Sequence, residues 1–72
     1  MDYSSIILQI RARLNLSQEK LGEMVGVSFS TINRWENNRA IPSRKHMCIL
    51  ENICEENNIK LEGVKHGKIE RN

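Results

Sequence analysis

Two adjacent side chains in the middle of the chain, Asn33 and Arg34, carry hydrogen-bonding groups of a kind that can pair with the base edges of duplex DNA. An asparagine amide pairs bidentately with adenine, and an arginine guanidinium pairs in the same way with guanine. Ser30 adds a hydroxyl, and the ring of Phe29 suits a thymine methyl group if it points outward; the alternative is that it packs beneath the preceding helix. We expect four residues to contact bases: Phe29, Ser30, Asn33 and Arg34.

Side chains suited to phosphate lie on both sides of this group. Ser17 and Gln18 begin one predicted helix, and Ser43, Arg44 and Lys45 begin another. Helix N-termini attract phosphate through free N–H groups and a partial positive charge. Solvated charge is the alternative for Arg44 and Lys45, but their position beside a helix cap favours phosphate contact. The residues expected to contact phosphate are Ser17, Gln18, Thr31, Arg39, Ser43, Arg44 and Lys45.

Apolar spacing predicts the two helices that come before the base-contacting group. A first helix is expected where isoleucine and leucine recur at helical spacing over 6–14, with Ser4 or Ser5 as its cap. A second helix is expected over about 18–24, with Ser17 as its cap. Both helices are amphipathic, so each is expected to turn one face towards a shared core.

Two glycines belong to the second helix and its end. Gly26 directly follows the apolar Val25 and is expected to adopt a left-handed conformation that stops the helix. Gly22 lies inside the helix, where glycine costs about 1 kcal/mol relative to alanine. We therefore expect another helix to approach Gly22 closely.

The third and fourth helices are predicted by capping serines and apolar stripes. A third helix over 29–37, capped by Ser28, is expected to bury Ile32 and Trp35 and to end at the asparagine pair 37–38. The fourth helix is expected to follow Ser43 and to end at the asparagine pair 57–58. Its predicted apolar stripe consists of Met47, Leu50, Ile53 and Cys54.

Length and composition limit the chain to one small domain. It has 72 residues, of which 39% are hydrophobic and 28% charged, and its net charge is +2. The segment 34–46 holds four cations and one carboxylate, so positive charge is concentrated near the expected DNA contacts. We expect an all-α domain over 1–62, with Ile59 and Leu61 folding back onto the core, and a polar C-terminal tail over 63–72.

Other chemistry finds little support in the sequence. Cys48 and Cys54 point in different directions on one predicted helix, so we expect buried or half-buried free thiols and no disulfide or zinc site. His46 lies near both, but nothing marks a nucleophile as activated, and an enzyme is not expected. The N-terminus has no basic segment followed by a long apolar one. We expect a cytoplasmic protein without membrane, metal, cofactor or small-molecule substrate.

Three segments resemble the Cro and phage-repressor family of helix-turn-helix DNA-binding domains, often called XRE-like. They are LSQEKLGEMVGVS at 16–28, STINRWEN at 30–37 and PS at 42–43. The resemblance extends over about residues 6–59, and it is specific because the segments recur together at fixed separations. It implies a compact, lambda-repressor-like fold of four to five helices.

The resemblance also implies roles for individual residues. The family's helix-two glutamine falls on Gln18, a phosphate contact, and its base readers fall on Phe29, Ser30, Asn33 and Arg34. Its backbone contacts after the third helix fall on Asn37, Arg39 and Arg44, which adds Asn37 to the expected phosphate contacts. The resemblance further implies an ion pair between Arg11 and Glu36.

Three positions depart from the family pattern. Gly22 replaces the usual alanine, and Asn38 replaces a common glycine, whose left-handed conformation asparagine also adopts. The segment 59–72 has no clear fifth amphipathic helix, a region that family dimers often use, so a homodimer on DNA and a monomer both stay open.

Two functions of different classes follow from these patterns. The first is sequence-specific binding of double-stranded DNA by a bacterial or phage transcriptional regulator, repressor-like, with helix 28–37 in the major groove. The alternative is a protein-interaction module, such as an antitoxin or adaptor, that uses the same fold.

Overall fold

The computed structural model of this protein describes residues 2–60, and all regular structure in that range is helical. Four helices follow one another: α1 (Tyr3–Leu14), α2 (Gln18–Val25), α3 (Phe29–Glu36) and α4 (Arg44–Glu56). The expected all-α fold is confirmed. Leu61, the expected domain boundary at residue 62 and the tail at 63–72 lie outside the described residues.

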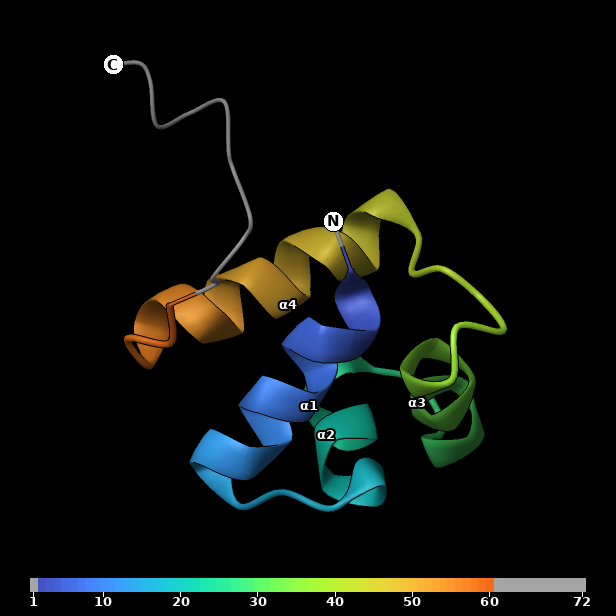
Figure 1. Ribbon diagram of the computed structural model, residues 1–72, viewed down its shortest axis with the longest axis horizontal. Coiled ribbons are helices and arrows are strands. Elements are labelled where there is room, and N and C mark those ends of the chain that lie inside the picture. Colours follow the sequence, from blue (N-terminus) through green and yellow to red (C-terminus); the bar gives the residue numbers. More distant parts are fainter. Residues whose placement is uncertain (1, 61–72) are drawn as a thin grey trace.

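The four helices pack around a shared core. α1 contacts both α3 and α4, while α2 contacts α3 and α4. In Figure 1, α4 runs across the upper part of the molecule, α2 lies below α1, and α3 lies at one edge, joined to α4 by an extended loop. This arrangement leaves the outer side of α3 open.

The core is built from one apolar stripe of each helix. Ile32 has no exposed surface and Trp35 retains 4%, as their spacing on α3 predicts. The other buried apolar residues are Ile6, Ile7, Ile10, Leu21, Val25, Leu50, Ile53, Cys54 and Ile59. Full burial of a large aliphatic side chain contributes roughly 1.5–3 kcal/mol. Met47 was expected in the α4 stripe but is only half-buried, so this expectation is wrong.

The start of α1 differs from the sequence expectation. Asp2, not Ser4 or Ser5, is the cap, and its carboxylate accepts a hydrogen bond from the Ser4 backbone N–H at 3.1 Å. Ser4 is buried inside the helix, where its hydroxyl donates to the Glu36 backbone carbonyl at 2.6 Å. The helix ends at Asn15, which is left-handed with φ 55°. Ser4, which local capping rules favour as the N-cap, therefore makes a tertiary hydrogen bond instead.

The turn between α2 and α3 is short and closed by backbone hydrogen bonds. Gly26 is left-handed with φ 91°, as expected, and its N–H donates to the Gly22 carbonyl at 2.7 Å. The Val27 N–H donates to the same carbonyl at 2.9 Å. Ser28 then caps α3 by accepting a hydrogen bond from the Thr31 N–H.

Gly22 is closely approached by this turn and not by another helix, which corrects the sequence expectation. A β-carbon at Gly22 would lie 2.5 Å from the Val27 carbonyl oxygen and 3.3 Å from the Ser28 carbonyl carbon. The turn folds back over α2 at this point, and only glycine leaves room for its backbone. The close packing of the turn offsets the helix propensity that glycine lacks relative to alanine.

Candidate nucleic-acid interface

The outer face of α3 carries all four residues expected to contact bases. Phe29, Ser30, Asn33 and Arg34 are exposed, while Ile32 and Trp35 hold the opposite face in the core. Phe29 keeps 54% of its surface accessible, so the alternative that it packs beneath α2 is wrong. The exposed groups are an aromatic ring, a hydroxyl, an amide and a guanidinium, a combination that suits the major-groove edges of bases.

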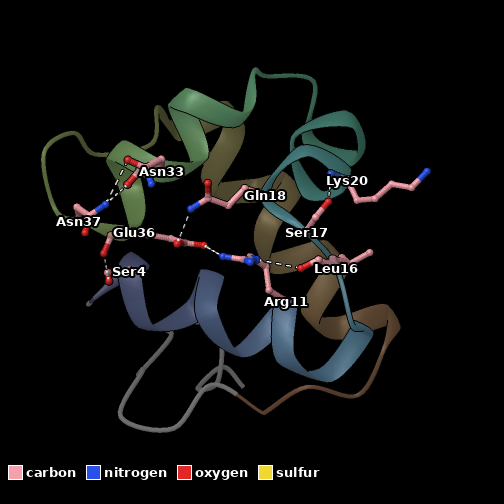
Figure 2. Close-up of polar contacts among 9 residues, drawn as sticks. All are labelled: Ser4, Arg11, Leu16, Ser17, Gln18, Lys20, Asn33, Glu36 and Asn37. Atoms are coloured by element: carbon pink, nitrogen blue, oxygen red, sulfur yellow. Dashed lines mark hydrogen bonds and ion pairs between the residues drawn. The ribbon is translucent and has the colours of Figure 1, made fainter.

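The last residue of α3, Glu36, joins three helices (Figure 2). Its carboxylate accepts hydrogen bonds from the Arg11 guanidinium at 2.6 Å and from the Gln18 amide at 2.9 Å, while its backbone carbonyl accepts from Ser4. Arg11 also donates through Nε to the Leu16 carbonyl at 3.0 Å. The Glu36 side chain is only 9% exposed. This network fixes where α3 ends relative to α1 and α2.

Gln18 helps to hold α2 against α3, a role that the sequence did not indicate. It starts α2, as expected for a phosphate contact, but its side-chain nitrogen donates to Glu36. An amide nitrogen has two hydrogens, so one donor stays available beside the helix N-terminus. The sequence held no signal for the Gln18–Glu36 bond, because the two residues are 18 positions apart and both are polar.

Four of the expected DNA contacts are exposed cations. Arg34, Arg39, Arg44 and Lys45 are exposed, and none forms an ion pair with another residue between 2 and 60. Ser43 caps α4, and its hydroxyl also lies 2.9 Å from Nδ1 of His46. The start of α4 therefore presents unpaired positive charge and a helix N-terminus on the same short segment.

The remaining expected phosphate contacts, Ser17, Thr31 and Asn37, form hydrogen bonds within their own helix or its cap. Ser17 is exposed and accepts a hydrogen bond from the Lys20 N–H at 3.0 Å. Thr31 is half-buried, with its hydroxyl 3.2 Å from that of Ser28. Asn37 donates through its side-chain nitrogen to Asn33, so its amide is held against its own helix.

A surface cavity of about 370 Å³ is lined by residues from the start of α1 and from α4. Tyr3 lines it and donates its phenol hydrogen to Glu51 at 3.0 Å. Burial, followed by the hydrogen bond to Glu51 and its charge, raises the pKa of Tyr3 to about 12. The cavity is also lined by Arg44, Met47 and Cys48.

The two cysteines differ in exposure. Cys54 is buried as expected, and burial raises the pKa of its thiol, whereas Cys48 is exposed, which corrects the expectation of a buried or half-buried thiol. Both thiols are free. Within residues 2–60 no three His, Cys, Asp or Glu side chains come together as a metal site would require. Nor does any helix of that range reach the length and hydropathy that membrane crossing needs.

Comparison with known proteins agrees with this geometry. A sequence model of the family described as helix-turn-helix matches residues 7–57. An uncharacterized HTH-type transcriptional regulator of Bacillus subtilis (strain 168), YgzD, is 38% identical over 58 residues, which cover 81% of this chain and 83% of that protein. No solved structure matches the chain. With its short α2, tight glycine turn and outward-facing α3, the chain belongs to the helix-turn-helix family of the Cro and phage-repressor (XRE) type.

Proposed function

We propose that this protein binds double-stranded DNA sequence-specifically and acts as a repressor-like regulator of transcription. Family membership supports DNA binding and regulation as the general role. One observation carries the finer proposal: Ile32 and Trp35 anchor α3 in the core while its other face stays exposed. In this proposal the protein acts in the cytoplasm of a bacterium, where it occupies an operator.

In this proposal α3 enters the major groove, which is about 12 Å wide and admits one helix with its side chains. Arg34 pairs with a guanine, Asn33 reads a neighbouring base, and Phe29 contacts a thymine methyl group. Ser30 contributes its hydroxyl at the same edge of the helix. The exposure of these four residues supports the assignment.

Phosphate contacts hold α3 in place along the groove. Arg39, Arg44 and Lys45 lie exposed after α3, and the N-terminus of α4 adds its partial charge. Ser17 and Gln18 start α2, which crosses the sugar-phosphate backbone. Ser43, Thr31 and Asn37 are the other proposed backbone contacts.

The number of copies on DNA determines the form of the operator. If two copies bind as a homodimer, half-sites lie about 34 Å apart and form a palindrome. A single copy requires one short asymmetric site. Sedimentation of the protein with and without a selected duplex distinguishes these arrangements.

A selection experiment tests the proposal. Duplexes bound by the protein are selected from a randomised pool, and their affinity is compared with that of scrambled duplexes by fluorescence anisotropy at physiological salt. Arg34→Ala is expected to weaken binding to the selected duplex by about tenfold or more and to relax the preference at one base pair. Arg13→Ala is the matched control, because Arg13 is exposed on α1. Equal affinity for selected and scrambled duplexes would refute sequence-specific binding.

A second candidate function is a protein-interaction module such as an antitoxin or adaptor. Three large apolar side chains outside α3 favour it: Leu8, Met24 and Ile41 are 49%, 46% and 77% exposed. Isolated exposed apolar residues are common on folded proteins, so this observation weighs less than the exposed polar face of α3. If Asn33→Ala and Arg34→Ala leave binding to the native partner intact, the interaction module is the better description.

A further inference from the structure

The side chains of Asn33 and Asn37 form a hydrogen-bonded pair one helical turn apart. The Asn37 side-chain nitrogen lies 2.8 Å from the Asn33 backbone carbonyl and 3.3 Å from the Asn33 side-chain oxygen. Figure 2 shows both contacts, drawn from one nitrogen of Asn37 to two oxygens of Asn33. Both side chains are exposed, and their four-residue spacing puts Asn37 on the same side of α3 as Asn33, which is on the face proposed to enter the groove.

The backbone carbonyl determines the orientation of both amides. A carbonyl oxygen only accepts hydrogen bonds, so Asn37 must turn its NH₂ group, and not its oxygen, towards Asn33. The atom of the Asn33 amide that meets this NH₂ must then be its oxygen. The Asn33 NH₂ group is consequently directed away from Asn37.

We infer that Asn37 is a specificity-determining residue, because it orients the Asn33 amide so that Asn33 offers a hydrogen-bond donor to the base it reads. This inference rests on the proposed function. Asn37 then acts through Asn33 as a positioning residue. The exposed end of its own amide is an acceptor, which does not attract phosphate, so for Asn37 this role takes the place of the phosphate contact proposed above.

The inference predicts which bases Asn33 accepts. In the major groove guanine offers two acceptors and thymine one, whereas cytosine offers only a donor and adenine offers both kinds. A donor from Asn33 therefore favours guanine and rejects cytosine at the same position of the contacted strand. Adenine is compatible with either orientation of the amide, so guanine against cytosine is the informative comparison.

The test replaces Asn37 with aspartate. The carboxylate cannot donate to Asn33, and its oxygens attract the Asn33 NH₂ group, which turns the Asn33 oxygen towards the base. Asn57→Asp is the matched control. Asn57 also caps a helix, α4, and its side-chain nitrogen donates to the carbonyl four residues earlier at 2.8 Å, but that residue, Ile53, has no amide side chain. Each aspartate adds the same charge.

The measurement is the ratio of affinities for guanine and cytosine duplexes at the base pair read by Asn33. Asn33→Ala first locates that base pair in the selected duplex, where it lowers the preference. The wild type is expected to favour guanine over cytosine by about tenfold or more, and Asn37→Asp to lower that ratio by at least about tenfold. Asn37→Ala adds no charge and is expected to bring the ratio close to one. Asn57→Asp is expected to leave the ratio unchanged.

Several outcomes overturn the inference. One is a ratio that stays within about twofold of the wild-type value in Asn37→Asp while overall affinity falls, because Asn37 then contacts phosphate or only caps the helix. Another is that Asn33→Ala changes the preference at no base pair. If the wild type itself shows no preference at any position, the proposed function fails instead. Circular dichroism melts of each variant establish that the compared proteins are folded.

Discussion

At the level of single residues, the carboxylate of Glu36 links α3 to both α1 and α2. It lies at the C-terminal end of α3, where the helix dipole disfavours negative charge, and it is only 9% exposed. The Arg11 guanidinium supplies the opposite charge, and the Gln18 amide occupies the second oxygen. Loss of the cation would leave a mostly buried charge with a single neutral donor.

Arg11→Ala is therefore expected to destabilise the protein by about 2 kcal/mol. This is less than for a fully buried ion pair because Arg11 keeps 28% exposure and solvent weakens the interaction. Urea denaturation followed by circular dichroism measures the change in the free energy of unfolding. Arg13→Ala, an exposed change on the same helix, should stay within about 0.5 kcal/mol. Equal effects of the two substitutions would mean that the pair adds nothing to stability.

Tyr3 is expected to make stability depend on pH in the alkaline range. Its pKa in the folded protein is raised to about 12 from a model-compound value of 10.0, so the folded state holds the neutral phenol more strongly. The stability from this group is complete below about pH 10 and is lost as the pH rises through 12.

Tyr3→Phe removes the titrating group and gives the test. The difference in the free energy of unfolding between wild type and Tyr3→Phe should be constant at neutral pH and should narrow between pH 10 and 12. Lysine and arginine titrate in both proteins, so their contributions cancel in this difference. A difference that stays constant up to pH 12 would show that Glu51 and burial do not hold the Tyr3 proton.

At the level of elements, the α2–turn–α3 unit depends on the absence of a side chain at Gly22. Gly22→Ala gains up to about 1 kcal/mol of helix propensity. The new β-carbon would lie 2.5 Å from the Val27 carbonyl oxygen, which is backbone and cannot move without displacing α3. We expect net destabilisation of about 1 kcal/mol, seen as a lower midpoint of thermal unfolding, together with weaker DNA binding.

Glu23→Ala is the control for this substitution. Glu23 is exposed in the same helix, and its 3.7 Å pair with Lys20 is exposed to solvent and adds little, so alanine there mainly changes propensity without a backbone clash. If Gly22→Ala raises the thermal midpoint as much as a change in propensity alone would, then the turn adjusts freely and does not determine where α3 lies.

Local chemistry was enough to predict most elements of this fold. Ser17, Ser28 and Ser43 cap the helices that they were expected to cap, because a serine followed by a helix-forming segment satisfies the free N–H groups wherever the rest of the chain lies. The stripe of Ile32 and Trp35 also follows from helical spacing alone. These features depend on neighbours within one or two turns.

The errors have a common physical cause, which is specific side-chain and turn contacts that helical spacing and capping rules do not describe. Ser4 donates a hydrogen bond to the Glu36 carbonyl 32 positions away, so its hydroxyl does not cap α1. Local sequence patterns could not predict this contact or the burial of Ser4. The neighbour of Gly22 depends on how the turn closes, and the exposure of Met47 and Cys48 depends on how α4 rotates against α1. In the candidate site, the exposure of the polar side chains of α3 followed from helical spacing, whereas the Asn33–Asn37 and Gln18–Glu36 bonds did not.

At the level of the whole molecule, positive charge is concentrated on one segment, while the net charge is only +2. The segment 34–46 carries four cations and one carboxylate, and it spans the end of α3, the loop and the start of α4. Phosphate contacts release counterions, so the proposed binding through this segment is expected to weaken as salt rises.

Lys45→Ala is expected to weaken binding to all duplexes by a similar factor. The slope of log affinity against log salt should become less negative by about 0.9, the value for one phosphate contact. Lys60→Ala is the control, because Lys60 is exposed beyond the other end of α4. A changed base preference in Lys45→Ala, or an unchanged salt slope, would remove Lys45 from the phosphate contacts. Anisotropy titrations at several salt concentrations provide the measurement.

The buried position of Trp35 gives this small protein an internal optical reporter. It is the only tryptophan in the sequence, it is 4% exposed on the inner face of α3, and its ring centre lies 5.5 Å from that of His46. Indole fluorescence shifts to longer wavelength when water reaches the ring. Unfolding is therefore detected as a shift of the Trp35 emission maximum, without an added dye. Because the ring faces the core, a duplex bound to the opposite face of α3 leaves that emission in place. The emission of one unlabelled sample therefore distinguishes a folded variant that no longer binds DNA from a variant that is unfolded.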